Sequence, residues 1–213
     1  MFRPALTRAL AAAVALTVPT LSSASVPSPA NSTLPACMAL CPMGDISFNV
    51  VVRDLANNPV LGSMVVLDFS GCPNGATICP FSPADPYIVD FAGRTLRRLT
   101  GTGGAVTFPA RVGGTGPAGC VRVFADGVLL KTYALASPDQ NGDGFVGGFV
   151  NSPDVPTFNA KLGSNDPTAD FDCSAFVDFS DQVIFYQHLS QSCDGYVDAA
   201  GRKTWGALKL FYR

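Results

Sequence analysis

Hydrophobic and polar residues alternate in short runs between residues 45 and 136. The runs are rich in β-branched and aromatic residues, and clusters of Gly, Pro, Asn and Asp separate them. Such a period of two is typical of strands that bury one face. The pattern predicts seven strands, at residues 45–54, 63–71, 87–91, 95–99, 105–110, 120–125 and 128–135. Asp126-Gly127 predicts a tight turn between the last two.

Seven short strands with regular turns predict an antiparallel β-sandwich of immunoglobulin-like architecture over residues 45–136. The stretches VVVRDLANNPVLGSMVVLDFSG, RRLTGTGGAVTFPARV and CVRVFADGVLL resemble bacterial Ig-like and carboxypeptidase-regulatory-like modules. That resemblance implies a spacer or binding unit without chemistry of its own. The basic cluster of Arg94, Arg97 and Arg98 is interpreted as the solvated face of a strand.

The pattern changes after Ala136. Two Asp-rich stretches follow, and each leads into apolar residues at helical spacing. The first set is Val155, Phe158 and Leu162, and the second is Ile184, Phe185, His188 and Leu189. We therefore expect two short helices in residues 137–196, each starting at an acidic loop.

The two ends of the chain carry no strand pattern. Residues 1–25 place Arg3 and Arg8 before an apolar run and end in small residues, as a secretory signal peptide does. No later run reaches the roughly 20 apolar residues of a membrane helix, so we expect a secreted protein without a membrane span. Residues 26–44 are rich in Pro and Ser and are interpreted as a linker. Residues 197–213 form a tail that either lies on the acidic module, acts as a recognition element, or packs Trp205, Leu208 and Phe211 on a neighbour.

Seven cysteines in an exported chain predict disulfides, with one thiol left over. Spacing favours Cys72 with Cys79 and Cys173 with Cys193. Cys37, Cys41 and Cys120 then compete for a third bridge, which Cys37 and Cys41 would form within the linker.

All 16 acidic residues are aspartates, which suit turns, caps and metal loops better than helices. Residues 26–138 contain six Asp against seven Lys and Arg, whereas residues 139–198 contain ten Asp against Lys161 alone. This charge argues against nucleic acid as a partner. Ten carboxylates in so short a segment predict either a bound cation or disorder.

The stretch DFDCSAFVDFSD, residues 170–181, fits the ligand register of a calcium loop. Such loops use oxygen ligands at positions 1, 3 and 5, a carbonyl at 7, often a water at 9 and a carboxylate at 12. Ala175 stands at position 6, where glycine normally makes the turn. The oxygen-only donor set favours Ca²⁺. The predicted ligands are Asp170, Asp172, Ser174, the Phe176 carbonyl, Asp178 and Asp181.

A related stretch lies upstream, at DQNGDGFVGGFVNSPD. It places Asp139, Asn141 and Asp143 at positions 1, 3 and 5. Aligning residues 149–158 with residues 176–185 makes Asp154 the equivalent of Asp181 and implies four extra residues in this loop. The carbonyl at position 7 would come from Phe145 or Phe149. The sequence thus predicts two calcium sites.

Two loop-helix halves joined by a short connector resemble a type I dockerin, a duplicated calcium-binding module by which secreted proteins dock to cohesins. The resemblance covers residues 137 to about 193. It implies two Ca²⁺ ions and a cohesin-like protein partner.

The sequence offers little for catalysis. His188 is the only histidine and lies on the second expected helix, so it is interpreted as a packing or surface residue. No G-x-S-x-G motif or phosphate loop occurs. We expect a non-enzymatic calcium-binding docking protein. The alternative is an accessory component of a polysaccharide-degrading system, or a small hydrolase.

Overall fold

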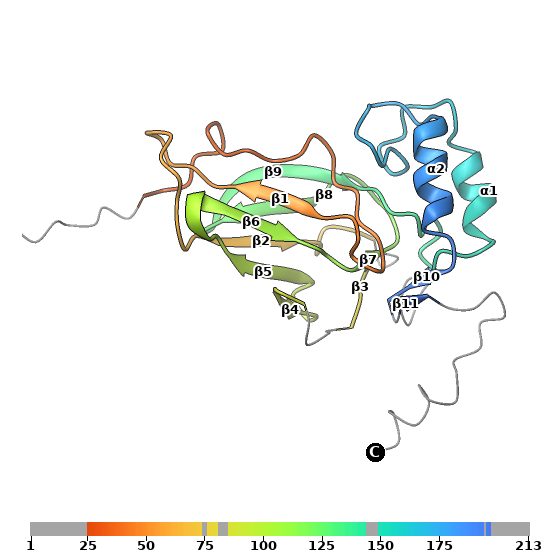
Figure 1. Cartoon of the computed structure of the whole chain (residues 1–213), viewed down its shortest axis with the longest axis horizontal. Coiled ribbons are helices and arrows are strands. Elements are labelled where there is room, and N and C mark those ends of the chain that lie inside the picture. The colour runs from red at the N-terminus through yellow and green to blue at the C-terminus, as the bar shows by residue number, and fades with distance from the viewer. Residues whose placement is uncertain (1–24, 74–75, 81–84, 144–148, 194, 197–213) are drawn as a thin grey trace, which may run out of the picture.

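The computed structural model describes residues 25–73, 76–80, 85–143, 149–193 and 195–196 (Figure 1). These residues form a β-rich body next to a pair of short helices. Residues 1–24 of the predicted signal peptide, residues 144–148 of the first predicted calcium loop and the tail 197–213 lie outside these ranges.

A five-stranded antiparallel sheet forms one layer of the β-rich body. Its strand order is β4 (Ile88–Asp90), β5 (Thr95–Leu99), β2 (Met64–Asp68), β8 (Gly116–Ala125) and β9 (Val128–Leu135). On the central strand Leu67 lies opposite Leu96 on one side and Val123 on the other. Asp126 and Gly127 both have positive φ, as a tight turn between β8 and β9 requires.

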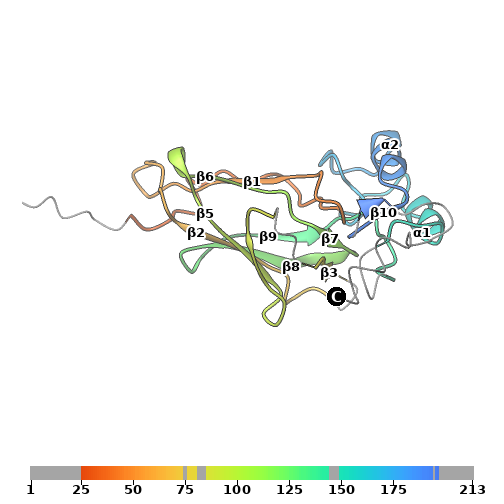
Figure 2. The ribbon, with the colours of Figure 1, turned by 60° about the horizontal axis from the view of Figure 1, so that its bottom comes forward.

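The second layer is the antiparallel pair β1 (Phe48–Val51) and β6 (Ala105–Phe108). Figure 2 shows this pair above β2, β8 and β9. A short 3-10 turn, η1 (Thr102–Gly104), precedes β6, and β3 (Thr77–Ile78) pairs with β7 (Val112–Gly113). The arrangement is that of a β-sandwich.

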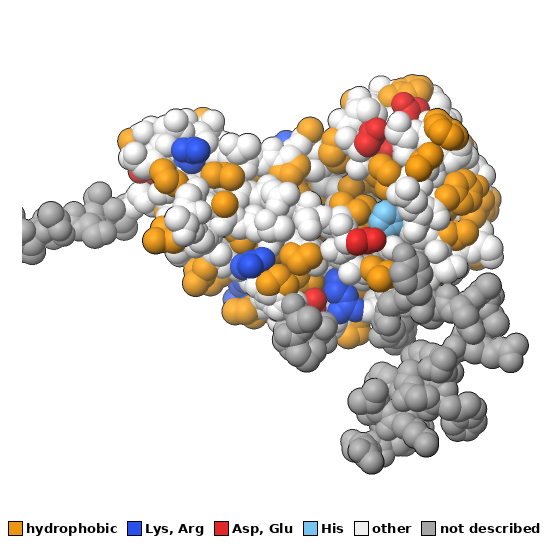
Figure 3. Space-filling model, in the orientation of Figure 1, with side chains coloured by type: hydrophobic (Ala, Val, Ile, Leu, Met, Phe, Trp, Pro, Cys, Tyr) orange, Lys and Arg blue, Asp and Glu red, His pale blue; other side chains and the backbone are white. Residues whose placement is uncertain are grey.

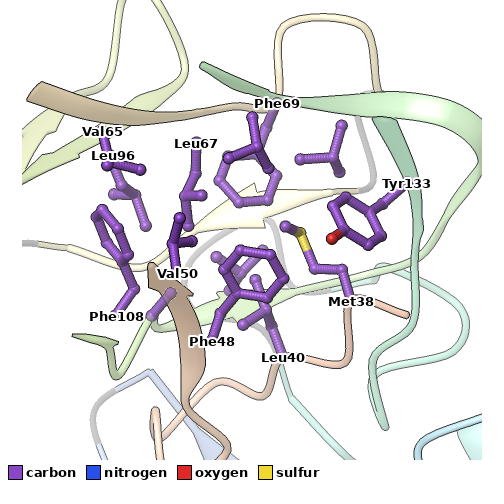
Figure 4. Packing of buried hydrophobic residues seen from close by; sticks show 14 of the residues in the cluster. Met38, Leu40, Phe48, Val50, Val65, Leu67, Phe69, Leu96, Phe108 and Tyr133 are labelled. Carbon is purple, nitrogen blue, oxygen red and sulfur yellow. The ribbon is translucent and has the colours of Figure 1, made fainter. Parts of the chain in front are cut away.

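The core lies between the two layers. Phe48, Val50 and Phe108 of the small layer point towards Val65 and Leu67 of the large sheet (Figure 4), and each is at most 3% exposed. Burial of side chains of this size stabilises the fold by roughly 1.5–3 kcal/mol each.

Residues 26–44 are part of this body, which corrects their interpretation as a linker. Thr33 forms a β-bridge with Val51, and Met38 and Leu40 are buried in the sandwich core. The sequence did not reveal this burial, because two apolar residues in a Pro- and Ser-rich segment are too few to form a periodic pattern.

Two helices form a second, smaller core beside the sandwich. They are α1 (Asp154–Asn159) and α2 (Phe179–Gln187), followed by the strand pair β10 (Gln191–Ser192) and β11 (Gly195–Tyr196). The rings of Phe158 and Phe185 stack with centroids 4.6 Å apart, and those of Phe158 and Phe171 stack with centroids 5.8 Å apart. Helix α2 begins two residues before Asp181 rather than after it.

Three disulfides are present, and none is among the predicted pairs. They join Cys37 to Cys173, Cys72 to Cys120 and Cys79 to Cys193. The predicted Cys72–Cys79 and Cys173–Cys193 bridges and the alternative Cys37–Cys41 bridge were therefore wrong. Spacing favours neighbours in sequence, whereas the fold brings distant cysteines together. Two of the bridges tie the helical part to the sandwich, and Cys41 is buried and free.

The prediction of a mainly β, antiparallel protein with disulfides is confirmed, and all seven predicted strands are present. The two-residue strands β3 and β7 were not expected, because two residues show no periodicity. Among the described residues neither helix is long or apolar enough to cross a bilayer. The immunoglobulin-like connectivity and the likeness of the helical part to a dockerin stay predictions.

Candidate metal centre

The carboxylates of the second acidic loop converge on one point. Oxygens of Asp170, Asp172 and Asp181 lie within 4.8 Å of one another. Asp170 and Asp181 are at most 5% exposed, whereas Asp172 reaches solvent. Three carboxylate groups at this separation repel one another unless a cation lies among them.

Asp181 organises the loop through three backbone hydrogen bonds. Its Oδ1 accepts from the N–H groups of Phe171 at 2.6 Å and Asp172 at 3.2 Å. Its Oδ2 accepts from the Asp178 N–H at 2.9 Å, and the Asp178 carboxylate in turn caps α2 by accepting from Ser180. One side chain thus fixes both the start of the loop and the start of the helix.

Asp154 does the same for the first loop. Its Oδ1 accepts from the N–H groups of Gln140 at 2.7 Å and Asn141 at 3.0 Å, and its Oδ2 accepts from the Asn151 N–H at 2.7 Å. Asp154 is fully buried. In both loops the last aspartate bonds the second and third loop residues and the residue three positions before itself.

The equivalence extends beyond the loops. Val150 N–H donates to the Gln191 carbonyl at 3.0 Å, and Ser190 N–H donates to the Val150 carbonyl at 2.7 Å. Val177 exchanges the same two bonds with Ser164 and Gly163, each at 2.8 Å. Each loop therefore pairs with the segment that follows the other helix.

The backbone geometry repeats as well. Ser190 and Gly163 occupy matching places after α2 and α1, and both have positive φ, at 71° and 79°. Residues 150 to 164 thus repeat as residues 177 to 191, a shift of 27. At the loop starts the shift is 31, because Asp139 corresponds to Asp170. The two shifts differ by four, in agreement with the four extra residues that the sequence alignment implied.

Two buried oxygens in the first loop have no hydrogen-bond partner among the described residues. They are Asp139 Oδ2 and Asn151 Oδ1. Buried polar atoms normally find a partner, so two unpaired oxygens in one acidic loop fit a site for a cation. Asn151 also donates to the nearby Asp143 carboxylate, at 3.2 Å to Oδ2.

No Lys or Arg compensates the loop charges within the described part of the chain. Lys161, the one cation of this region, pairs with Asp166 outside both loops and donates to Gln140 and Thr168. Burial raises the pKa of Asp139 to about 7, and the charge of Asp154 adds to the effect. Burial likewise raises the pKa of Asp154 and of Asp170. A bound divalent cation would remove this penalty.

The predicted ligands have different surroundings. In the second loop Ser174 Oγ donates to the Phe176 carbonyl at 2.8 Å, and the Asp178 carboxylate is engaged as the helix cap. In the first loop Asn141 Nδ2 donates to Asp143 at 2.8 Å. Phe145 lies outside the described residues.

Asn151 was missing from the predicted ligand set. It is the counterpart of Asp178, and the alignment of residues 149–158 with residues 176–185 already places the two together. The signal was present, but an amide is a weaker indicator of a cation site than a carboxylate. We add Asn151 to the candidate oxygen donors of the first loop.

A scan against protein-family models finds no match to this chain, and a search of curated proteins finds no relative. The functional argument therefore depends on the geometry of the two loops.

We expect replacement of Asp139 by Asn to remove a loss of stability that the wild-type protein shows as pH rises. The folded-state pKa of Asp139 lies near 7, above its ordinary value of 3.8. The calcium-free folded protein thus holds a proton that the unfolded chain releases, so this carboxyl lowers the free energy of unfolding as pH rises from about 4 to about 7. In calcium-free buffer, urea denaturation should give wild type and Asp139→Asn similar stability near pH 4 and the variant higher stability near pH 8. A difference that is the same at both pH values would contradict the assigned pKa.

Ala175 provides a second test, since it has a φ of 70° at the turn position that glycine normally occupies. This conformation costs an L-residue roughly 1–2 kcal/mol, of which glycine recovers part. We expect Ala175→Gly to raise the free energy of unfolding by up to about 1 kcal/mol in calcium-free buffer. The matched control is Ala160→Gly, because Ala160 has an ordinary helical φ of −65° and should gain nothing. Equal effects of the two variants would show that the turn is not strained.

Proposed function

We propose that the protein is a secreted, non-catalytic calcium-binding protein whose residues 137–196 bind two Ca²⁺ ions and dock to a protein partner. One observation carries the proposal. Asp154 and Asp181 hold two acidic loops through the same set of backbone hydrogen bonds, so the described parts of the loops match in space as well as in sequence. Helix caps and turns alone do not require such duplication.

The donor chemistry supports calcium over other metals at these loops. All candidate ligands are carboxylate, amide, hydroxyl or carbonyl oxygens, which hard cations prefer. The candidate donors of the first loop are Asp139, Asn141, Asp143, Asn151 and Asp154, and those of the second loop are Asp170, Asp172, Ser174, Phe176, Asp178 and Asp181.

Secretion is supported by the three disulfides, which form and persist in oxidising compartments. The predicted signal peptide is consistent with this location. Two of the disulfides also anchor the calcium-binding part to the sandwich, so the sandwich serves as the scaffold on which the module is presented.

The surface of α2 supports docking. Phe179, Val183 and Tyr186 are 74%, 40% and 46% exposed and, with Gln182 and Gln187, line a shallow open hollow. Figure 3 shows apolar side chains gathered on the exposed surface of the helical part. We propose that this face contacts a cohesin-like partner, as the resemblance of the duplicated loops to a type I dockerin implies. Calcium bound by Asp181 would act directly on this face, because Asp181 lies in the first turn of the same helix.

Calcium should stabilise the chain strongly if both loops bind it. When the free Ca²⁺ concentration is a hundred times Kd, one site adds about 2.7 kcal/mol to the free energy of unfolding. That gain raises the Tm of a chain of this size by roughly 5–10 °C. We expect two such increments for residues 26–213 in thermal unfolding followed by circular dichroism. Asp143→Asn and Asp172→Asn should each remove about one increment, because both side chains are exposed and neither change disturbs the core.

Asp54→Asn is the matched control for this experiment, since Asp54 accepts backbone bonds in an exposed turn of the sandwich. It should leave the calcium response unchanged. The experiment needs the chain with its disulfides intact, because the Cys37–Cys173 and Cys79–Cys193 bridges would be cut in an isolated module. Absence of any calcium-dependent rise in Tm would refute the proposed function.

Docking has its own test. A panel of recombinant cohesin domains should include one that binds the protein in calcium but not in chelator, as measured by biolayer interferometry. We expect the double variant Phe179→Ser/Tyr186→Ser to weaken that binding at least about tenfold, because exposed aromatic residues dominate protein interfaces. The control pair is Leu55→Ser/Leu61→Ser, which changes two exposed apolar residues of the sandwich. Binding that is equally strong in calcium and in chelator, or no binding to any domain of the panel, would contradict docking through α2.

A further inference from the structure

A second kind of metal-ligating cluster lies where the helical part meets the sandwich. Ligand atoms of Cys41, Asp45 and His188 lie within 4.8 Å of one another. Asp45 Oδ1 is 2.5 Å from Cys41 Sγ and 3.4 Å from His188 Nε2. All seven cysteines belong to the described part of the chain, and Cys41 alone forms no disulfide. The acidic loops contribute nothing to this cluster.

The histidine is oriented for ligation. Its Nδ1 lies 2.6 Å from the Ile184 carbonyl oxygen, which can only accept, so Nδ1 carries the proton. The lone pair available to a metal ion is then on Nε2, the atom 3.4 Å from Asp45 Oδ1. Metal-binding histidines are typically held in this way, with the other ring nitrogen donating to a carbonyl or carboxylate.

Gln191 adds an independent observation. Its Nε2 donates to Asp45 Oδ2 at 3.0 Å, and the residue is 1% exposed. Its Oε1 is buried without a hydrogen-bond partner among the described residues. A water bound to a metal at this cluster would supply the missing donor.

We propose that Cys41, Asp45 and His188 form a zinc site with three protein ligands and one position for water. One thiolate, one imidazole and one carboxylate form a donor set that Zn²⁺ accepts in tetrahedral geometry. The same set is poor for Ca²⁺, which prefers oxygen ligands only. Cys41 and His188 are buried, whereas the Asp45 side chain is 49% exposed and provides a way in from solvent. In Figure 3 the imidazole of the single histidine is visible at the surface beside an acidic side chain.

A nucleophilic cysteine fits the same residues less well. Reactive thiols have a lowered pKa and a cationic partner. Here the thiol donates to the Asp45 carboxylate rather than to His188, and burial together with Asp45 raises the pKa of Cys41 to about 12. A metal ion displaces the thiol proton directly, whereas an attacking thiolate would have to form without such help.

The position of the site gives it a structural role. Cys41 forms a β-bridge with Arg111 of the sandwich, and His188 is the C-terminal cap of α2. Gln191 is also the residue whose carbonyl accepts from Val150 of the first acidic loop. A bound ion would therefore hold the end of α2 and the adjoining loop to the sandwich, in addition to the two disulfides that already join these parts.

Cobalt is the probe for this site, because a thiolate bound to Co²⁺ gives an intense near-ultraviolet charge-transfer band that oxygen ligands do not give. The test uses residues 26–213 with the three disulfides intact and saturating Ca²⁺ in the acidic loops. We expect one equivalent of Co²⁺ to produce the band and Zn²⁺ to abolish it by displacement. Cys41→Ser should remove the band, and Asp45→Asn and His188→Gln should each weaken Co²⁺ binding at least about tenfold.

The far-ultraviolet circular dichroism spectrum and the Tm without added metal serve as the folding control for all three variants, so loss of the band cannot be ascribed to unfolding. Asp54→Asn is the matched control for charge, since it removes an exposed carboxylate of the sandwich that belongs to neither proposed metal site and should leave the band unchanged. Absence of the band in folded wild-type protein, or a band that persists at full strength in both Asp45→Asn and His188→Gln, would overturn the zinc site. Neither outcome would affect the proposed calcium sites, which contain no thiolate.

Discussion

The carboxylates of Asp154 and Asp181 each hold three backbone N–H groups, and the architecture of residues 137–193 depends on these six bonds. Both side chains are fully buried, so loss of either carboxylate would leave up to three donors unpaired, at about 1–3 kcal/mol each. The same carboxylates stand beside other aspartates that no Lys or Arg of the described chain neutralises. The geometry that the loops need is thus also a concentration of like charge, which a bound divalent cation would neutralise.

The repulsion among these carboxylates explains why two disulfides join the helical part to the sandwich. The helices α1 and α2 have six and nine residues, too few to be stable alone in water. Their shared core is built around stacked phenylalanine rings and is closed by loops that carry repelling charges. The disulfides from Cys173 to Cys37 and from Cys193 to Cys79 restrict the unfolded chain and hold the loops near their folded arrangement. In our two proposals, calcium and zinc would then add to a frame that is already covalently fixed.

Much of the sandwich could be predicted from the sequence, because its strands alternate cleanly. The residue ranges 95–99 and 128–135 coincide with β5 and β9. The duplicated loops could be aligned for a similar reason, since FVNSPD and FVDFSD keep the same spacing to Phe158 and Phe185. What could not be predicted is the long-range pairing. The disulfide partners are 48 to 136 residues apart, and the packing of Met38 and Leu40 depends on where the N-terminal segment runs. The cluster of Cys41, Asp45 and His188 was hidden for the same reason, because its members come together only in the folded chain.

The central claim is that the two equivalent loops are two calcium sites, and calorimetric titration of the calcium-free protein with Ca²⁺ tests it most directly. The account predicts two ions per chain for residues 26–213, and one ion for either Asp143→Asn or Asp172→Asn when the affinity of the altered site falls below the range of the titration. A stoichiometry of zero, or of two ions that both variants leave unchanged, would contradict it.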